Sequence, residues 1–278
     1  MPSSDDQITV TPLTPNIGAE ISGIQLANAV DQTRYGLIHQ ALMDHQVVFF
    51  RDQEMTLEQH KNFAKQFGEL HIHPAYPQQE DGHPEIMRIH TDANSTRHAG
   101  EEWHSDVTCD EEPPMGTILH LHTVPKAGGD TLFMSSYAAY DALSDTMKDF
   151  LDGMTAHHSG EVVYRGRYTY LEVDDKGMEY PNNDHPLIRT HPVTKKKGIF
   201  VNRTFTSHIN GLKKSESDAL LEMLYRHMEK PDFQVRFQWK PGSVAFWDNR
   251  CVQHYAVWDY FPETRSGYRV TVCGDKPF

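Results

Sequence analysis

The stretch WHSDVT, residues 103–108, holds the most informative pattern in this chain. His104 and Asp106 stand two residues apart, and residues i and i+2 of a β-strand point to the same face. If this stretch ends a strand, its imidazole and carboxylate can therefore meet one metal ion. A distant histidine, His254, follows the stretch WDNRCVQ at residues 247–253. It must come from another strand that the fold brings alongside.

Two imidazoles and one carboxylate form the facial triad of non-haem Fe(II) oxygenases, which leaves the opposite coordination positions open for substrate chemistry. The sequence therefore predicts that His104, Asp106 and His254 bind Fe(II) and form the catalytic centre. Alone, an H-x-D triplet is weak evidence, because this chain has 18 histidines. The prediction gains its weight from other motifs.

Those motifs occur in an order typical of one family. The stretch GGDT at residues 128–131 predicts a tight turn that opens into a strand, and RSGYR at residues 265–269 follows His254. The stretches GAEI at 18–21, RTHP at 189–192 and WDNR at 247–250 complete the pattern. Together with the triad they resemble the taurine dioxygenase (TauD/TfdA-like) family of Fe(II)- and 2-oxoglutarate-dependent dioxygenases, from residue 18 to residue 278.

The resemblance implies a β-rich fold with flanking helices, a double-stranded β-helix (jelly-roll) core in a single domain spanning residues 1–278. The element pattern permits this fold without requiring it, because short strands gather in the second half and helices lie outside the strand clusters. A polar, weakly periodic segment, residues 157–185, is expected to form an active-site lid over the barrel mouth.

Hydrophobic periodicity predicts individual elements as well. Helices are expected over residues 31–44, 56–67, 137–151 and 218–228, with Thr56 and Ser215 as caps. Strands are expected over residues 8–13, 47–50, 117–122, 235–239, 243–247 and 268–272.

The resemblance implies Fe(II) as the cofactor, with 2-oxoglutarate and O2 as co-substrates. It also implies which residues bind 2-oxoglutarate. Arg265 is expected to meet the far carboxylate of 2-oxoglutarate, because a guanidinium binds a carboxylate through two parallel hydrogen bonds. The hydroxyl of Thr131 is expected to help. Taken singly, Arg265 also fits a surface charge and Thr131 an ordinary strand residue.

A substrate site is implied by the stretch HPAY at residues 73–76. His73 and Tyr76 resemble the H-P-x-Y segment through which taurine dioxygenases contact their substrate. Arg269 matches the arginine that meets the substrate's anionic group. A histidine donor and an arginine fork suit the three oxygens of a sulfonate. Gly100 stands where the family carries an asparagine near the amine of taurine, so a different organic portion is expected.

We therefore expect hydroxylation of a small anionic substrate, a sulfonate, at the carbon bearing sulfur, with release of sulfite, an aldehyde, succinate and CO2. An aryloxyalkanoate, a sulfate ester or another carboxylate remains an alternative, because an arginine fork also binds carboxylates. A metal-dependent hydrolase, from another class, would use three ligands and a bound water without Arg265. A non-catalytic binding module is disfavoured because all three metal ligands are present.

Bulk composition bounds location and partners. A net charge of −13 argues against nucleic acid or an anionic membrane as partner, and it means that a dianionic co-substrate needs locally placed cations. Three cysteines argue against a disulfide framework. The N-terminus lacks the features of a signal peptide and no apolar run approaches the ~20 residues of a membrane span, so a cytoplasmic protein is expected. Family analogy implies a homo-oligomer, a dimer or a tetramer.

Overall fold

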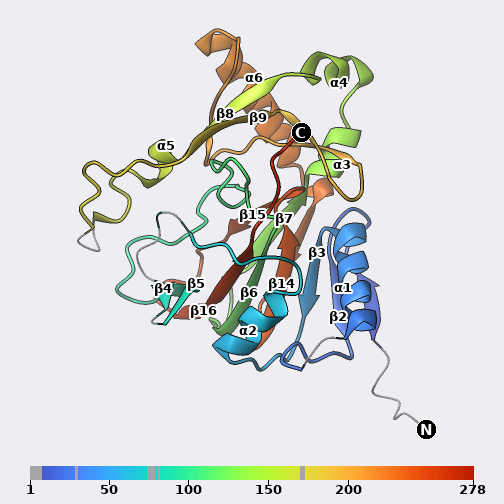
Figure 1. The fold of residues 1–278 in the computed structure, drawn as a ribbon, viewed down its shortest axis with the longest axis vertical. Helices are drawn as coiled ribbons and strands as arrows, with labels where there is room; N and C mark the ends of the chain where they lie inside the picture. Colours follow the sequence, from blue (N-terminus) through green and yellow to red (C-terminus); the bar gives the residue numbers. More distant parts are fainter. Residues whose placement is uncertain (1–7, 29–30, 74, 76–78, 81, 170–172) are drawn as a thin grey trace.

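Two sheets, both mainly antiparallel, form the core of the chain (Figure 1). The computed structural model describes residues 8–28, 31–73, 75, 79–80, 82–169 and 173–278. The larger sheet has the strand order β1 (Thr9–Pro12), β2 (Ala19–Ser22), β3 (Val47–Phe50), β14 (Ser243–Asp248), β6 (Gly116–Thr123), β16 (Arg265–Val272), β5 (His83–Thr91) and β4 (Gln79–Glu80). The smaller sheet has the order β13 (Gln234–Phe237), β7 (Thr131–Ser135) and β15 (Val252–Ala256).

The inner faces of the two sheets pack against each other through aromatic rings. Phe49 of β3 stacks on Phe237 of β13 with ring centroids 3.9 Å apart, and it meets Phe133 of β7 edge-on at 5.5 Å. All three side chains are buried. Face-to-face packing of two sheets around such a core is the jelly-roll architecture. The predicted jelly roll with flanking helices is therefore confirmed.

Two N-terminal helices, α1 (Gln32–His45) and α2 (Leu57–Ala64), contribute to the cluster on the outer face of the larger sheet. Leu42 of α1 and Phe63 of α2 belong to the same buried cluster as Phe246 of β14. The predicted cap of α2 is confirmed, because the Thr56 hydroxyl accepts from the Gln59 N–H at 3.2 Å and the Gln59 side chain accepts from the Thr56 N–H at 2.9 Å. This capping box fixes where the chain turns from β3 into α2.

The prediction of one helix over residues 137–151 is wrong. The structure has two helices, α3 (Ser136–Asp141) and α4 (Asp145–Leu151). The hydroxyl of Ser144 accepts from the N–H of Met147 at 3.3 Å and so starts the second helix. A serine that captures a nearby backbone N–H competes with a continuous helix, and periodicity alone does not register this.

The predicted cap of α6 (Lys214–Met228) is also wrong, since Lys213 and not Ser215 occupies the N-cap position. The Glu216 carboxylate accepts from the Lys213 N–H at 2.9 Å. Ser215 therefore lies inside the first turn. The apolar side chains of α6 pack with those of α3 and α4 in a second buried cluster, which also holds Met134 of the smaller sheet.

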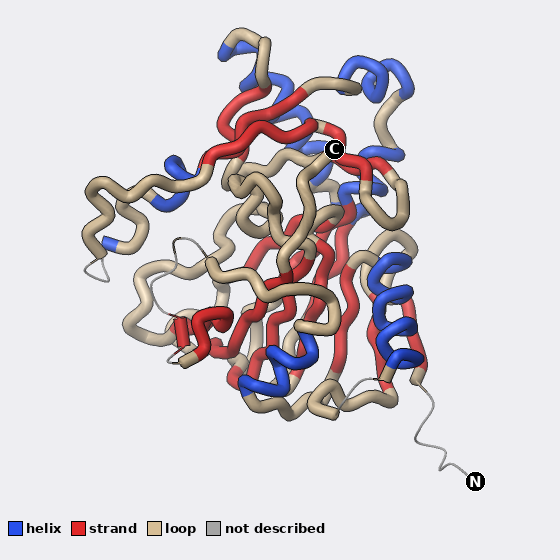
Figure 2. The backbone as a smooth tube through the Cα atoms, viewed as in Figure 1, coloured by secondary structure: helices blue, strands red, loops and turns tan. Residues whose placement is uncertain are grey.

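The segment 157–185 is more ordered than a loop at both ends. It includes the end of β8 (Thr155–Ser159), the short helix α5 (Gly160–Tyr164) and the start of β9 (Asn182–Pro186). Strands β8 and β9 pair antiparallel beside β12 (Thr206–Ile209), and a further pair consists of β10 (Ile188–Thr190) and β11 (Lys197–Ile199). In Figure 2 the stretch between α5 and β9 is mostly loop. The strands β5 and β15 were not predicted. In β5 every residue from 87 to 91 lines a cavity, which obscures the alternation of apolar and polar side chains that marks a strand.

Candidate active site

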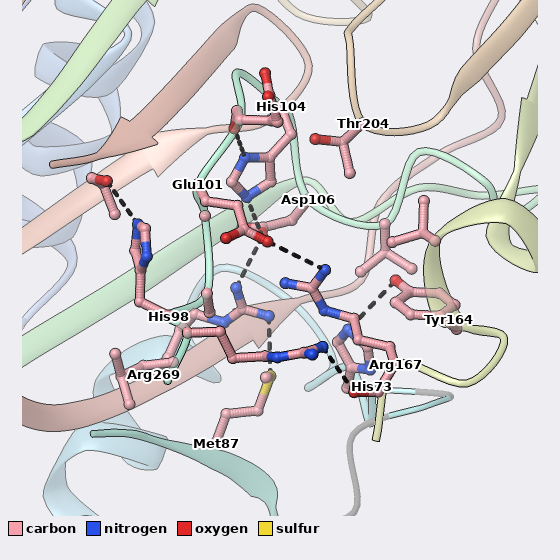
Figure 3. Close-up of a pocket in the computed structure, with 18 of the residues that line it drawn as sticks. His73, Met87, His98, Glu101, His104, Asp106, Tyr164, Arg167, Thr204 and Arg269 are labelled. Atoms are coloured by element: carbon pink, nitrogen blue, oxygen red, sulfur yellow. Dashed lines mark hydrogen bonds and ion pairs between the residues drawn. The ribbon is translucent and has the colours of Figure 1, made fainter. Parts of the chain in front are cut away.

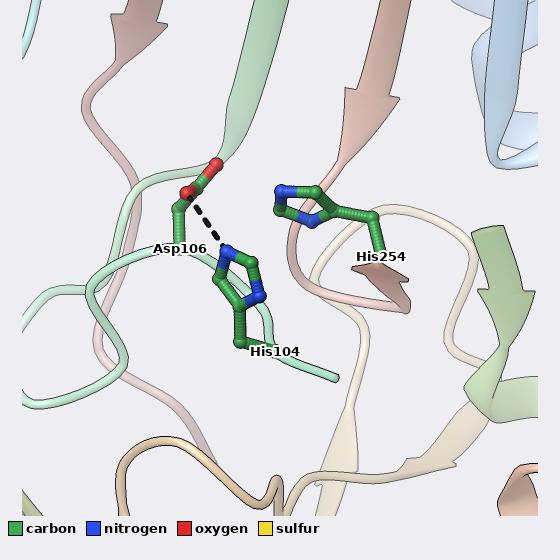
Figure 4. Close-up of side chains that lie close together, drawn as sticks. All are labelled: His104, Asp106 and His254. Carbon is green, nitrogen blue, oxygen red and sulfur yellow. Dashed lines mark ion pairs between the residues drawn. The ribbon is translucent and has the colours of Figure 1, made fainter. Parts of the chain in front are cut away.

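The three predicted metal ligands lie close together (Figure 4). His104 forms an isolated antiparallel bridge with His254 of β15, with backbone hydrogen bonds of 3.2 and 2.8 Å in the two directions. The two ring centroids are 4.1 Å apart. Ligand atoms of His104, Asp106 and His254 all lie within 4.8 Å of one another. Two imidazoles and a carboxylate thus converge as a facial triad requires.

The local backbone differs from the expected strand end. Asp106 begins a turn two residues after the bridged residue His104, and Val107 has a left-handed φ of 47°. The two ligands are therefore brought to one side by a bridge followed by a turn. His104 and Asp106 therefore lie close together as predicted, but they do not lie on one strand as the prediction assumed.

The protonation of both imidazoles suits a metal. The Nδ1–H of His104 donates to the Glu102 carbonyl at 2.7 Å, which leaves Nε2, 3.9 Å from Asp106 Oδ1, as the ligand atom. Burial foremost lowers the pKa of both His104 and His254, so both rings are neutral. The Nδ1 of His254 is buried without a hydrogen-bond partner among the described residues. A buried imidazole nitrogen in that state is costly unless a ligand satisfies it, and the donor set fits Fe(II).

A hydrogen-bond network holds the Asp106 carboxylate. Its Oδ2 accepts from the Thr117 hydroxyl at 2.7 Å, and its Oδ1 accepts from Arg269 Nη1 at 2.8 Å. The Asn249 amide donates to the Thr117 hydroxyl at 3.0 Å and is itself held by the indole N–H of Trp247 at 2.9 Å. Burial opposes the charged form, yet the Arg269 charge and the other neighbours prevail and keep the pKa of Asp106 below its usual value. The WDNR stretch is part of the family pattern in the sequence, but the sequence did not predict that Asn249 supports the hydroxyl of Thr117.

A second cluster of possible ligands, His191, Asp248 and Cys251, is an ion-pair network. Arg250 donates to both oxygens of Asp248 at 2.9 and 2.7 Å, and His191 Nε2 lies 3.0 Å from the same carboxylate. Burial raises the pKa of the Cys251 thiol well above its usual value, so a thiolate ligand is disfavoured. This network fixes the turn that carries Asn249.

The predicted 2-oxoglutarate residues also meet in space, at the starts of β16 and β7. Arg265 donates from Nε to the Gly129 carbonyl at 3.0 Å and from Nη2 to the Thr131 hydroxyl at 3.3 Å. The indole N–H of Trp239 donates to the same hydroxyl at 2.9 Å, and the guanidinium lies 5.5 Å from the centre of that ring. Gly128 and Gly129 both have positive φ, but residues 128–130 form no hydrogen-bonded turn before β7 begins, so the predicted tight turn is replaced by a loop.

Arg265 is a buried cation with only 5% of its surface exposed. Burial lowers its pKa, and among the described residues no carboxylate forms an ion pair with it. A buried charge calls for an opposite charge and further hydrogen bonds. The pair of Arg265 and Thr131 therefore suits the carboxylate of a bound ligand.

The predicted substrate residues His73 and Arg269 line one cavity with two of the predicted metal ligands, His104 and Asp106 (Figure 3). The Nδ1 of His73 accepts from the Ala75 N–H at 3.1 Å, so Nε2 carries the proton. Burial, and then the nearby Arg269 charge, lower the pKa of His73 to about 3. Arg269 contacts Met87 Sδ through Nη2 at 2.9 Å, while its Nε is buried without a hydrogen-bond partner among the described residues. Tyr76 lies outside the described residues.

The cavity has a volume of about 360 Å³, within the range of roughly 300–1,000 Å³ typical of small-molecule sites. Apolar side chains of the segment 157–185 and of the loop after β11 line part of it: Val162, Val163, Tyr164 and Phe205. Arg167, paired with Glu101 at 3.7 Å, also lines it. Sequence reasoning missed these residues because nothing in their spacing marks them. At Gly100 an added Cβ would lie 3.3 Å from the His104 ring, so a side chain there would press on one of the predicted metal ligands.

Comparison with known proteins agrees with this site. The profile of the family described as "Taurine catabolism dioxygenase TauD, TfdA family" matches residues 9–271. An alpha-ketoglutarate-dependent sulfonate dioxygenase of Saccharomyces cerevisiae is 37% identical over 98% of this chain and 68% of its own length. An alpha-ketoglutarate-dependent sulfate ester dioxygenase of Pseudomonas putida is 33% identical over 98% of this chain and 91% of its own.

Solved structures agree as well. The crystal structure of a taurine dioxygenase from Burkholderia xenovorans superposes with a TM-score of 0.83 and 38% identity, covering 97% of this chain and 92% of that one. Among the helices that the structure describes here, none is both long and apolar enough to span a bilayer. The chain belongs to the TauD/TfdA family, and it is an Fe(II)- and 2-oxoglutarate-dependent dioxygenase that acts with O2 on a small molecule.

Proposed function

We propose that this dioxygenase hydroxylates an organosulfonate at the carbon that bears sulfur. One observation carries the proposal: His73 and Arg269, two donors suited to an anion, line the same cavity as His104 and Asp106. His73 offers an Nε2–H because its Nδ1 is an acceptor, and Arg269 offers a buried Nε–H. An anion bound between them would place its neighbouring carbon beside the metal ligands.

The other residues have distinct roles in this proposal. His104, Asp106 and His254 hold Fe(II), and Thr117 fixes the carboxylate through its hydroxyl. Arg265 and Thr131 bind the far carboxylate of 2-oxoglutarate, supported by the buried, unpaired charge of Arg265. The neutral rings of the two histidines keep their lone pairs available to the metal.

With Fe(II), 2-oxoglutarate and O2 bound, such a centre supplies oxidation of a C–H bond while 2-oxoglutarate leaves as succinate and CO2. Hydroxylation of the carbon bearing sulfur gives an α-hydroxysulfonate, whose C–S bond breaks as the hydroxyl proton is lost. The products are an aldehyde and sulfite. The role of Arg269 and His73 is to hold the sulfonate so that this carbon, and no other, faces the centre.

The shape of the cavity bears on the organic portion. Val162, Val163 and Phe205 line it, and glycine at position 100 removes an amide that would favour an amine. An apolar chain longer than that of taurine fits these walls. The yeast sulfonate dioxygenase supports the sulfonate, while the Pseudomonas relative keeps a sulfate ester as the alternative. Carboxylates such as aryloxyalkanoates also remain, because an arginine fork binds them.

Three further predictions from the sequence stay predictions. We propose that the segment 157–185 acts as a lid, since Val162, Tyr164 and Arg167 come from it and line the cavity. Self-association as a dimer or tetramer and a cytoplasmic location are expected as before. The alternative of a metal-dependent hydrolase is wrong, because the chain belongs to a family of dioxygenases.

The test is coupled release of sulfite and succinate from purified protein given Fe(II), ascorbate, 2-oxoglutarate and a panel of sulfonates, sulfate esters and carboxylates. Equal amounts of sulfite and succinate from an alkanesulfonate support the proposal. Succinate without sulfite across the sulfonates would overturn it and leave the carboxylate or sulfate ester alternative. His104→Ala is the control, and it should release neither product because one of three metal ligands is gone.

A further inference from the structure

Tyr164 reaches the proposed anion site from a different element than His73 or Arg269. Its hydroxyl lies 3.4 Å from His73 Nε2, and the two rings meet edge-on with centroids 5.4 Å apart. Figure 3 shows the hydroxyl turned toward His73. Tyr164 lines the cavity although only 3% of its surface is exposed. It ends α5, in the segment that no motif of the sequence marked.

The donor directions of this pair follow from the histidine tautomer. Because His73 Nδ1 accepts from the Ala75 N–H, Nε2 holds the ring proton and donates toward the Tyr164 oxygen. At 3.4 Å this bond is at the long limit for a hydrogen bond. The phenolic proton of Tyr164 then has the Cys109 sulfur as its neighbour, a weak acceptor that the oxygen of a bound anion would outcompete. Burial raises the pKa of Tyr164 well above its usual value, so the phenol stays protonated.

The position of the ring is fixed by close neighbours. Tyr164 packs with Val107, Cys109, Tyr180 and Phe205 in one buried cluster, and two of these follow the metal ligand Asp106 closely in sequence. Its ring centroid lies 5.5 Å from that of Tyr180 and 6.0 Å from that of Phe205. A donor held this firmly loses little conformational entropy when it binds an acceptor.

We propose that Tyr164 donates the third hydrogen bond to the substrate anion and so selects a group with three terminal oxygens over a carboxylate. This inference rests on the proposed function. When an anion binds, the long 3.4 Å contact between His73 Nε2 and the Tyr164 oxygen is given up, so that Arg269 Nε–H, His73 Nε2–H and the Tyr164 hydroxyl each supply a donor from a separate element. A sulfonate or sulfate group can accept from all three, one oxygen each. A carboxylate also has lone pairs for three hydrogen bonds, but they lie in one plane on two oxygens, so donors that arrive from three separate elements meet it with poorer geometry.

The test compares binding of 1-hexanesulfonate and heptanoate, whose six-carbon chains are the same, to the protein loaded with Mn(II) and 2-oxoglutarate. Calorimetry gives both Kd values for the unchanged protein and for Tyr164→Phe, which removes only the hydroxyl. The sulfonate Kd should rise about tenfold, the usual worth of a hydrogen bond to a charged acceptor. The heptanoate Kd should change less than about twofold. The ratio of the two Kd values is a readout that a purely structural role would not move.

Tyr180→Phe is the matched control, because Tyr180 belongs to the same cluster while its hydroxyl donates to Asp175 at 3.3 Å. Both Kd values should stay unchanged there. Equal losses for the two anions in Tyr164→Phe, or no loss, would overturn the role of Tyr164. If the phenylalanine variant melts at lower temperature, Tyr164→Met repeats the test with an apolar side chain that fills the cluster. A failure of the unchanged protein to bind any sulfonate would refute the proposed function and this inference together, whereas sulfonate binding without the Tyr164 effect refutes the inference alone.

Discussion

The buried carboxylate of Asp106 shows how single residues set the chemistry of this centre. A carboxylate excluded from water is costly unless cations and donors surround it. Asp106 has a guanidinium on one oxygen and a hydroxyl on the other, and it lies beside two neutral imidazoles. It therefore stays ionised and oriented before a metal arrives. The residues that secure this, Thr117 and Asn249, lie 11 and 143 positions away in sequence.

Thr117→Val should weaken metal binding about 10- to 100-fold, the usual effect of losing a partner that orients a ligand. Valine has nearly the same shape, so the change removes the 2.7 Å hydrogen bond to Asp106 Oδ2 and leaves strand β6 intact. Competition with a fluorescent chelator measures the Mn(II) affinity. Thr123→Val, at the end of the same strand, should leave that affinity unchanged; an equal loss in both variants would contradict the role of Thr117.

Arg265→Lys should raise the KM for 2-oxoglutarate about 10- to 100-fold, because lysine keeps the charge but not the planar fork. Arg265 is buried and donates to both the Gly129 carbonyl and the Thr131 hydroxyl, and the single ammonium of lysine cannot reproduce this pair of hydrogen bonds together with two to a carboxylate. Succinate release measures KM. Arg51→Lys is the control, since Arg51 pairs with Glu20 and is not among the residues that line the cavity. An unchanged KM in Arg265→Lys would assign the co-substrate elsewhere.

At the scale of elements, the short helix α5 depends on close contacts rather than on intrinsic helix stability. Helices this short are unstable alone, and α5 is held by Ser159, whose hydroxyl accepts from Val162 N–H at 3.3 Å, and by a bond from Gly160 N–H to the Pro181 carbonyl at 2.8 Å. An added Cβ on Gly160 would lie 2.7 Å from that carbonyl and 3.3 Å from the Tyr164 ring. The absence of a side chain at position 160 therefore sets where Tyr164 lies.

Gly160→Ala should lower Tm and raise the Kd for a sulfonate while leaving the KM for 2-oxoglutarate unchanged. The reason is that the new methyl group must displace Pro181 or Tyr164, whereas Arg265 and Thr131 lie on other elements. Thermal denaturation and calorimetry measure the two effects. Gly36→Ala, inside α1 with nothing within 4 Å of the added Cβ, should instead stabilise by about 1 kcal/mol. If the sulfonate Kd of Gly160→Ala is unchanged, the position of α5 does not affect binding at the anion site.

For the whole molecule, net charge and local charge have opposite signs. The chain carries a net charge of −13, yet the cavity contains the buried guanidinium groups of Arg265 and Arg269, 5% and 9% exposed. Burial keeps these charges weakly screened, so an anion near them is attracted in spite of the acidic surface. The local arrangement of charged side chains in the cavity, and not the net charge of the chain, therefore predicts what this protein binds.

Buried neutral histidines make the stability of the whole chain depend on pH. Burial lowers the pKa of His60, His73 and His158 to about 3, from 6.5 in the unfolded chain. Between these values the unfolded state binds more protons than the folded state. The stability is therefore fully present above about pH 6.5 and is lost as the pH falls toward 3, at about 1.4 kcal/mol per pH unit for each histidine.

Urea unfolding of the metal-free protein between pH 7.5 and 5 measures this dependence. The free energy of unfolding should fall with pH at a slope of at least three protons near pH 5. His158→Gln removes one titrating ring and should reduce the slope by about one proton. A free energy that stays flat between pH 6.5 and 5 would mean that these rings are accessible to protons in the folded state.

The sequence by itself predicted the fold family, and it predicted two sets of residues, one for iron and one for 2-oxoglutarate, that the structure brings together. These groups belong to short motifs, and the chemistry of metal and carboxylate binding restricts the residue types at each position. His104, Asp106 and His254 converge, and so do Thr131 and Arg265. Helix caps made by local contacts were predicted with mixed success, correctly at Thr56 and incorrectly at Ser215.

Only the tertiary structure decided which other side chains complete the site. Tyr164 meets the cavity from the end of α5, and Phe205 and Gly100 meet it from two separate loops; nothing in their local sequence requires this. The orientation of Asp106 follows from Thr117 on strand β6 and from Arg269 on strand β16. Residues that bind a metal or a carboxylate belong to short motifs, so the sequence predicts them. Selectivity for a substrate depends on side chains that distant segments bring together, and this packing is decided only when the two sheets close around the site.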